Sequence, residues 1–267
     1  MIFLQTTELE IKTEQITADD VLRTAMDVGE GLLRSGAEIQ RIEDTITRIA
    51  KAYGAVHVEV FTITTLIIAS VRMPDGGYSS QNRRVLTSST NLHRLAKYNE
   101  ISREICAGGV SIDQAQQKLK AVKRSEPYPI WVFYIGVIFS AGGFAVFFGG
   151  SLLDGVVAAA IGILMMLIDQ HKPPFMNGMA SAVFTSFVGG ALAELCAHFG
   201  LCHNMDMVII GTIMLLIPGL TIGTSVRDML CGDIVTGSIR FIQSLLLACV
   251  IAFGYGVAML LVGGLLG

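Results

Sequence analysis

Charged side chains are scarce in this sequence, and their distribution is uneven. Asp, Glu, Lys and Arg make up 15% of the 267 residues, against about a quarter in a typical globular domain. Most of them precede Pro127, and from Ile130 onward the charges are isolated. Because 52% of the residues are hydrophobic and the mean hydropathy is +0.61, the chain is too apolar for an ordinary soluble protein. We predict two domains, 1–127 and 128–267, which meet at a pair of prolines.

Several features that would indicate other classes of protein are also missing. With a net charge of −3, the chain lacks the basic excess of a nucleic-acid binder, so no nucleic-acid partner is expected. The five cysteines include no CxxC pair, and no cluster of His and Cys has the spacing of a metal site. Neither a phosphate-binding glycine loop nor a catalytic constellation is present, so we expect no cofactor, no ATP-driven transport by this chain alone and no enzyme activity. No cleavable signal peptide is visible, because the first long apolar run begins after residue 129.

The second domain does contain long apolar runs. A membrane-spanning helix needs about 20 predominantly apolar residues. The fourth run is short and ends in Pro218-Gly219, so we expect a tilted or broken helix there. Many glycines in these runs allow the helices to approach closely and to form a packed bundle. The sequence predicts about five transmembrane helices, at 130–148, 152–168, 179–199, 207–220 and 234–266.

Lys and Arg residues alternate between the predicted connections. Several stand just before the first helix, Lys172 lies in the second connection, and Arg227 lies in the fourth. The first connection, 149–151, and the third, 200–206, contain neither residue type. Because cytoplasmic loops carry the excess of Lys and Arg, this alternation predicts a cytoplasmic N-terminal domain and a C-terminus outside.

The first domain has the pattern of a small α+β unit. Thr17 precedes two acidic residues as the N-cap of a helix, and isoleucines at 39–49 form the apolar stripe of another helix. Runs rich in β-branched residues predict strands at 56–62 and 66–73, and two further helices follow. The expected fold is therefore an α-helical membrane protein, with an N-terminal cytoplasmic α+β domain followed by about five transmembrane helices.

Two stretches of the sequence carry a resemblance to a known family. One is GLLRSGAEIQRIEDTITRIAKAYG at 31–54, together with NLHRLAKYNEISREI at 91–105. The other is LLIPGLTIGTSVRDMLCGDIVTGSIRF at 215–241. Together they closely resemble the threonine/serine exporter family in its short two-component form, which includes a succinate-exporter subunit. The resemblance implies a bacterial inner-membrane protein that exports a small amino acid or carboxylate, driven by an ion gradient.

The resemblance also implies a partner. Longer family members fuse two halves in one chain, whereas this sequence stops after the first half. We therefore expect a second small multi-spanning membrane subunit to complete the transporter, in addition to the solute and the lipid bilayer. Many secondary transporters consist of two inverted repeats around a midplane site, and an odd number of spans inverts a following copy.

The second stretch supplies the candidate transport site. Pro218 removes a backbone donor, and irregular backbone inside a bilayer survives only where it is packed in protein or lines a polar cavity. Charged residues in membrane helices face such a cavity or a partner, and Arg240 lies two helical turns beyond Asp233, where the two could pair. The candidate residues for binding the solute or a coupling ion are Pro218, Gly219, Thr221, Thr224, Arg227, Asp228, Asp233, Arg240, Asn177 and Glu194.

Structural interpretations of the same residues stay open. The charged segment could be a cytoplasmic loop with Asp233 as a helix N-cap, Asn177 could be a plain helix cap, and Glu194 could be a hydrated residue near the outer interface. In the first domain, the glutamates of the family motif are expected to pair along the helix with Arg34, Arg41 or Arg48, in preference to gating or sensing a substrate. The residues of that motif are Ser35, Gly36, Ala37, Glu38, Glu43, Arg84 and Asn91.

Alternatives for the function also stay open. An amino acid needs one cationic and one anionic contact, whereas a dicarboxylate prefers two cationic donors, and both kinds of residue are present. A non-transporting regulatory or assembly subunit is the main alternative. An intramembrane aspartyl protease is a minor one, because Asp233 would need a second carboxylate at close range and Asp206 is expected at the opposite membrane face.

Overall fold

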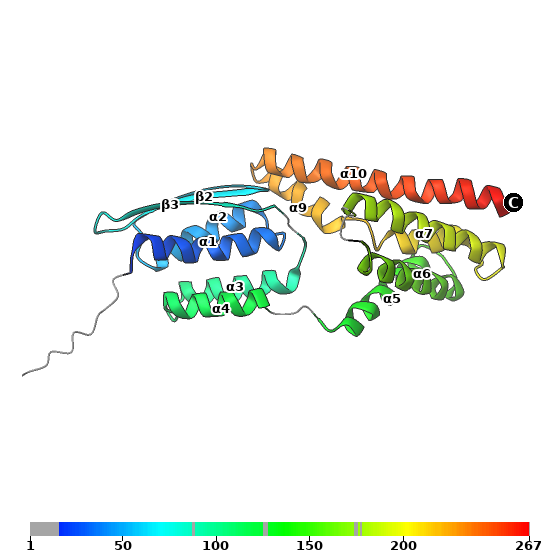
Figure 1. Ribbon diagram of the computed structural model, residues 1–267, viewed down its shortest axis with the longest axis horizontal. Coiled ribbons are helices and arrows are strands. Elements are labelled where there is room, and N and C mark those ends of the chain that lie inside the picture. The colour runs from blue at the N-terminus through cyan, green and yellow to red at the C-terminus, as the bar shows by residue number, and fades with distance from the viewer. Residues whose placement is uncertain (1–15, 87–88, 125–127, 174–175, 177, 267) are drawn as a thin grey trace, which may run out of the picture. The chain divides into compact units, whose positions relative to one another are not determined.

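The computed structural model describes residues 16–86, 89–124, 128–173, 176 and 178–266 (Figure 1). The chain divides into two compact units, Met1–Ser125 and Glu126–Gly267. The first unit contains helices and a sheet, and the second is helical. The predicted fold class is therefore confirmed.

Four helices and a three-stranded sheet build the first unit. In chain order they are α1 (Ala18–Arg34), α2 (Ile39–Ala52), β1 (His57–Ile63), β2 (Leu66–Arg72), β3 (Tyr78–Arg84), α3 (Leu92–Cys106) and α4 (Ile112–Arg124). The strands are antiparallel in the order β1-β2-β3. Helices α1 and α2 pack on one face of the sheet, and α3 and α4 pack on the side of these helices that faces away from it (Figure 1).

Alternating burial along the central strand determines which face of the sheet meets the helices. Ile67, Ala69 and Val71 of β2 are at most 1% exposed, whereas Ile68 between them is 42% exposed. The inward side chains join the fully buried isoleucines of α2 in one core. The β-branched residues of the strand and the three- and four-residue spacing of the isoleucines in the helix are the patterns that predicted these elements.

The third strand is an element that the sequence patterns did not predict. Its sequence, YSSQNRR, is polar throughout except for its tyrosine. The inward-facing Gln81 donates a hydrogen bond of 2.7 Å to Asp19 of α1, and Arg23 forms an ion pair of 2.8 Å with the same carboxylate. The hydrogen bonds from Arg23 and Gln81 lower the pKa of the Asp19 carboxyl. Main-chain pairing with β2 and polar contacts with α1 therefore hold β3 in the sheet. In most strands an apolar stripe has this role.

Helices of very different lengths build the second unit. They are α5 (Ile130–Phe147), α6 (Leu152–Gln170), α7 (Gly178–His198), α8 (Met205–Ile213), α9 (Gly219–Leu230), α10 (Ile234–Ala258), the π-helical turn η1 (Met259–Gly263) and α11 (Gly264–Leu266). Among the described residues, four helical segments are long and apolar enough to cross a membrane: α5, α6, α7 and the continuous segment Ile234–Leu266. Their bounds agree to within two residues with four of the predicted spans.

The predicted fourth span, at 207–220, is broken, as Pro218-Gly219 led us to expect, but its bounds are wrong. Helix α8 ends at Ile213 and α9 begins at Gly219, so two short helices take the place of one continuous helix. Apolar side chains continue through 214–217, and a hydropathy pattern therefore does not show the interruption. Most of α9 lies in the segment that was expected to connect two spans.

Glycines let helices of the second unit pack backbone against backbone. A Cβ atom on Gly142 of α5 would lie 2.8 Å from the carbonyl oxygen of Gly155 in α6. A Cβ atom on Gly211 of α8 would lie 2.4 Å from the carbonyl oxygen of Ala141 in α5. Since a backbone oxygen cannot move aside as a flexible side chain can, only glycine fits at these positions.

The buried carboxylate of Asp154 joins the start of α6 to the loop before α8. It accepts hydrogen bonds from the backbone N–H and the hydroxyl of Ser151, both at 2.8 Å. It also accepts from the backbone N–H groups of His203 at 2.7 Å and Asn204 at 3.0 Å. The residue is only 1% exposed. Asp154 therefore caps one helix and fixes the entry to another.

Replacing Asp154 with alanine is expected to destabilise the purified protein in detergent by at least about 2 kcal/mol, because the N–H groups of His203 and Asn204 lose their acceptor. Unfolding by heat or denaturant measures the change. Asp206→Ala is the matched control, since this exposed carboxylate in the first turn of α8 contributes less than about 1 kcal/mol. Equal stability of the two variants would contradict the role of Asp154.

Candidate functional site

The chain between α8 and α9 leaves the helical hydrogen-bond pattern at residues 214–218. Ile217 N still donates to the Ile213 carbonyl at 3.2 Å, but Pro218 has no N–H with which to continue the series. Gly219 N turns back to the Ile217 carbonyl at 2.9 Å, and the first regular bond of α9 joins Ile222 N to the Pro218 carbonyl at 3.0 Å. The backbone is therefore interrupted beside Pro218-Gly219.

Helices α9 and α10 form a hairpin whose arms are in close contact. Gly232 in the turn has a φ of +103°, a conformation that favours glycine, and Asp233 N donates to the Asp228 carbonyl at 3.0 Å. At the start of α10, Gly237 lies against α9, and a Cβ atom there would lie 2.7 Å from the Ser225 carbonyl oxygen. The hairpin thus brings side chains of the two helices face to face.

Asp228 of α9 and Arg240 of α10 meet across this hairpin. Arg240 Nη1 donates to Asp228 Oδ2 at 3.1 Å, and Arg240 is 7% exposed and Asp228 2% exposed. Burial of a charge is costly unless the charge is paired and hydrogen-bonded, so each of these two groups requires the other. The predicted pairing of Arg240 with Asp233 is wrong, because Asp233 lies at the start of α10 whereas the hairpin places Asp228 opposite Arg240.

The other candidate residues of this segment are placed differently. Thr224 Oγ1 donates to the Thr221 carbonyl at 3.1 Å, so this hydroxyl is used within α9. Arg227 is exposed, and Asp233 occupies the N-cap position of α10 without a capping hydrogen bond from its side chain. The Asp228 carboxylate has an arginine beside it, unlike the two carboxylates of an aspartyl protease, which share a proton.

Two further candidate residues do not join the hairpin. Glu194 of α7 lies near the far end of the last long helix, where a Cβ atom on Gly263 would be 3.2 Å from Glu194 Oε1. Asn177 lies outside the residues that the structure describes. The structure therefore brings Asp228 and Arg240 together and places Glu194 elsewhere in the bundle.

A second polar cluster lies inside the bundle, and no sequence pattern marks it. The hydroxyl of Tyr255 in α10, which is 3% exposed, donates to Thr212 Oγ1 of α8 at 2.9 Å. Gly189 of α7 makes room for it, since a Cβ atom there would lie 2.8 Å from the Tyr255 hydroxyl oxygen. One turn earlier in α7, Thr185 Oγ1 is buried without a hydrogen-bond partner among the described residues. The interior of the unit is thus polar on the α7, α8 and α10 side.

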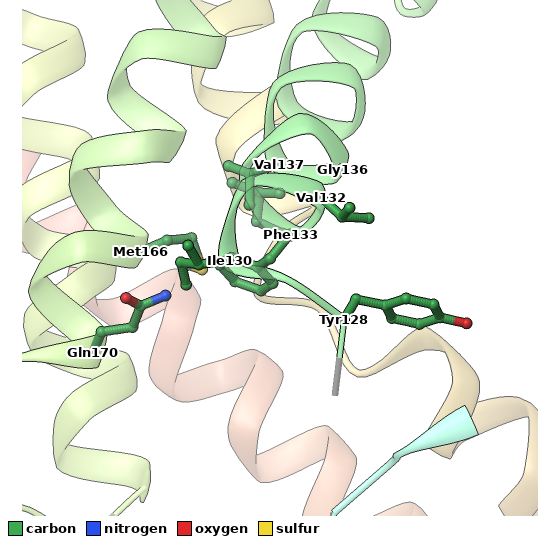
Figure 2. Close-up of a pocket in the computed structure, with 9 residues that line it drawn as sticks. Tyr128, Ile130, Val132, Phe133, Gly136, Val137, Met166 and Gln170 are labelled. Carbon is green, nitrogen blue, oxygen red and sulfur yellow. The ribbon is translucent and has the colours of Figure 1, made fainter. Parts of the chain in front are cut away.

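An apolar pocket of about 550 Å³ lies between α5 and α6, and Leu215 of the interrupted segment helps to line it. Figure 2 shows Phe133 of α5 with Met166 and Gln170 of α6 around this pocket. Gln170 Oε1 accepts a hydrogen bond of 3.1 Å from Tyr134. No charged side chain lines the pocket among the described residues, so it does not suit a carboxylate or an amino acid.

The SGAE motif, residues 35–38, forms the joint between α1 and α2. Gly36 has a φ of +83°, at which a larger residue is strained. Ser35 Oγ donates to the Gly31 carbonyl at 2.7 Å, and Asn91 N donates to the Ser35 carbonyl at 3.2 Å. Asn91 is also the N-cap of α3. The motif therefore has a structural role, because it shapes the joint and ties it to α3.

The acidic residues of α2 make contacts other than the predicted ones. Glu43 Oε1 accepts a hydrogen bond of 2.7 Å from the backbone N–H of Thr62 in β1. The predicted pairing of Arg34 and Arg48 with Glu38 or Glu43 is wrong, because both arginines bind other acids on their own helices. These ion pairs are Arg34–Glu30 at 2.8 Å and Arg48–Asp44 at 2.9 Å. Arg84 is exposed at the end of β3.

Comparison with known proteins identifies relatives over most of the chain. Residues 23–262 match the family model described as "Putative threonine/serine exporter" (ThrE). The chain is 28% identical to the Mycobacterium tuberculosis protein named "Probable threonine/serine exporter", over 88% of this chain and 45% of that protein. It is 26% identical to the "Threonine/serine exporter" of Corynebacterium glutamicum, over 91% of this chain and 52% of that protein. The chain thus spans about half the length of these two relatives.

A shorter relative matches over nearly its whole length. The Escherichia coli protein named "Probable succinate transporter subunit YjjP" is 26% identical, over 95% of this chain and 98% of that protein. No solved structure matches the chain. The family match includes both the α+β unit and the long apolar helices. The chain is therefore a multi-pass membrane protein that belongs to the threonine/serine exporter family.

Proposed function

We propose that this chain is one subunit of a secondary transporter that exports a small carboxylate, and that a second multi-spanning membrane protein completes the transporter. The observation that carries this proposal is the buried pair of Asp228 and Arg240, which lies in the hairpin that follows the interrupted helix. Charged residues in membrane helices mark solute or ion pathways. Interrupted helices form the binding sites of many secondary transporters.

Succinate is the first candidate for the solute. The relatives are named for two different solutes, threonine or serine on one side and succinate on the other. The match to the succinate-named protein covers almost all of both chains, whereas the matches to the threonine/serine-named proteins cover about half of those proteins. Coverage therefore favours a dicarboxylate over an amino acid.

In the proposed mechanism, a carboxylate of the solute competes with Asp228 for Arg240. A guanidinium group binds a carboxylate through two parallel hydrogen bonds, so the solute can replace the internal partner. The displaced Asp228 then binds a proton or a cation, because a buried carboxylate without a counter-charge is costly. Binding of the solute and binding of the coupling ion are thereby linked at one pair of residues.

The interruption at 214–218 supplies the movement that export needs. A few residues outside regular helix can absorb the changes in φ and ψ of a hinge. The α9–α10 hairpin is held together by the Asp228–Arg240 pair and by close contact at Gly237. We therefore propose that the hairpin moves as one body relative to α8 when the site changes its access from one side to the other.

We also propose a bacterial inner-membrane location, with the first unit in the cytoplasm and the C-terminus outside. The alternation of Lys and Arg between the connections supports this orientation. Residues 205–230, which comprise α8, the interruption and α9, are numerous enough to form one further crossing. The word "subunit" in the name of the Escherichia coli relative supports a partner that completes the transporter.

Co-expression tests the proposed function. Cells preloaded with labelled succinate, threonine and serine would express this chain, a candidate partner subunit, or both. We expect succinate efflux only when both proteins are present. Efflux with the partner alone would instead assign this chain a regulatory or assembly role, and no efflux of the three solutes in any combination would contradict the proposal.

A further inference from the structure

The first unit contains a polar pocket that the proposed transport mechanism does not use. The pocket has a volume of about 340 Å³ and lies between α2 and α3, two helices that pack against each other (Figure 1). Its volume lies in the range of sites for small ligands. Its residues come from this unit alone, so the pocket does not depend on the transmembrane helices.

The lining of the pocket has a surplus of positive charge. Arg41, Arg48 and Arg103 line it together with one acidic residue, Asp44. Arg48 forms an ion pair of 2.9 Å with Asp44, and this pair leaves no net charge. Within the described part of the chain, neither Arg41 nor Arg103 has an ion-pair partner. Arg41 and Arg103 therefore carry the surplus of two positive charges, and no carboxylate of the described residues forms an ion pair with either of them.

Beneath these arginines lie uncharged polar residues. Thr45, Asn99 and Ser102 line the pocket and are 6%, 8% and 9% exposed. The side-chain amide of Asn99 donates to the Leu95 carbonyl at 2.8 Å, which fixes its orientation. The arginines, by contrast, are exposed. The pocket therefore has a polar floor and a rim that carries exposed cations, an arrangement that suits an anion with several acceptor oxygens.

We propose that this pocket binds a small dianion, either a dicarboxylate or inorganic phosphate. Both groups present planar or forked pairs of oxygens that match the donor geometry of guanidinium. Two negative charges balance the surplus carried by Arg41 and Arg103. A bound dianion bridges α2 and α3, so its occupancy stabilises the first unit. This proposal does not rest on the proposed transport function.

Titration calorimetry of the full-length protein in detergent tests the proposal, with succinate and inorganic phosphate as probes. We expect at least one of them to bind, and Arg41→Gln or Arg103→Gln to weaken that binding by about tenfold each, because each removes a charge-assisted hydrogen bond. Arg72→Gln is the matched control, since Arg72 is exposed on the outer face of the sheet and does not line the pocket. Its affinity should equal that of the unchanged protein.

Two further variants distinguish binding in this pocket from misfolding and from binding at the transport site. Asp44→Asn should tighten binding severalfold, because it frees Arg48 for the anion, and misfolding cannot produce a gain in affinity. Asp228→Asn should leave the binding to this pocket intact, which separates it from the Asp228–Arg240 pair. Binding of neither probe, or unchanged affinity in both Arg41→Gln and Arg103→Gln, would overturn the proposal.

Discussion

Exchanging Asp228 for asparagine is expected to reduce efflux to the level of cells that lack the chain, while the protein still inserts into the membrane. The amide cannot take up a proton in exchange for the solute, and, because it carries no charge, it cannot neutralise the buried Arg240 or hold a cation as strongly as a carboxylate does. It does retain an oxygen that can accept the hydrogen bond now made by Arg240 Nη1 at 3.1 Å. The measurement is efflux of labelled solute from cells that co-express the partner, together with the amount of protein in the membrane fraction.

Three controls separate loss of function from loss of structure at this pair. Asp228→Ala should also destabilise the protein by about 3–5 kcal/mol, because it removes the carboxylate that neutralises the buried Arg240 guanidinium. Exchanging both residues, as Asp228→Arg with Arg240→Asp, should recover much of the stability but not the efflux. Asp206→Asn alters an exposed carboxylate of the same unit and should leave efflux unchanged. Normal efflux by Asp228→Asn would exclude the pair from the transport site.

Leucine at Gly142 is expected to have the largest effect on the folding of the second unit. The new side chain would meet the backbone of α6, where even a Cβ atom comes within 2.8 Å of a carbonyl oxygen. Overpacking by a few methylene groups costs about 1–3 kcal/mol in a core that can adjust, and here the opposing atoms are backbone. We therefore expect a loss of at least about 3 kcal/mol, or failure to obtain a monodisperse protein.

The neighbouring residue provides the matched control. A Cβ atom on Gly143 would meet nothing within 4 Å, and this residue is exposed. Gly143→Leu changes the composition of the same helix by the same amount, so its hydropathy and helix propensity match those of Gly142→Leu. Size-exclusion profiles and melting temperatures in detergent should resemble those of the unchanged protein. Similar damage from both variants would show that the contact between α5 and α6 is not the cause.

The four long membrane helices could be predicted because each is one continuous apolar run. Pro218-Gly219 predicted a break in the fourth helix, but the bounds of α8 and α9 could not be predicted, for two physical reasons. Hydropathy is a sum over side chains, and the apolar run continues through 214–217, so hydropathy does not locate the end of α8. Helix α9 carries Thr224, Arg227 and Asp228, which resemble a solvated loop until the hairpin buries one face. Strand β3 was missed for a similar reason, since its inward side chains are polar and find partners on α1.

The sequence predicted which residues belong to the candidate site, but not which of them contact each other. Asp228 and Arg240 both belong to the sequence motif, and their meeting depends on the hairpin turn at Gly232 and on the close approach at Gly237. The hydroxyl pair of Thr212 and Tyr255 lies 43 positions apart, without any local pattern. Contacts of this kind follow from three-dimensional packing, which periodicity in a single sequence does not encode.

The contacts of Asp154 also have an order in time. Its acceptor bonds to His203 and Asn204 join residues 49 and 50 positions apart. A ribosome adds about 5–20 residues per second, so Asp154 is synthesised roughly 2–10 seconds before these partners. In that interval, Ser151 can already donate a hydrogen bond to the Asp154 carboxylate. The Asp228 carboxylate waits for a shorter time, because its partner Arg240 follows after only 12 positions, which takes roughly 1–2 seconds. The connection between the start of α6 and the loop before α8 can therefore close only after α7, which lies between them in the chain, has been translated.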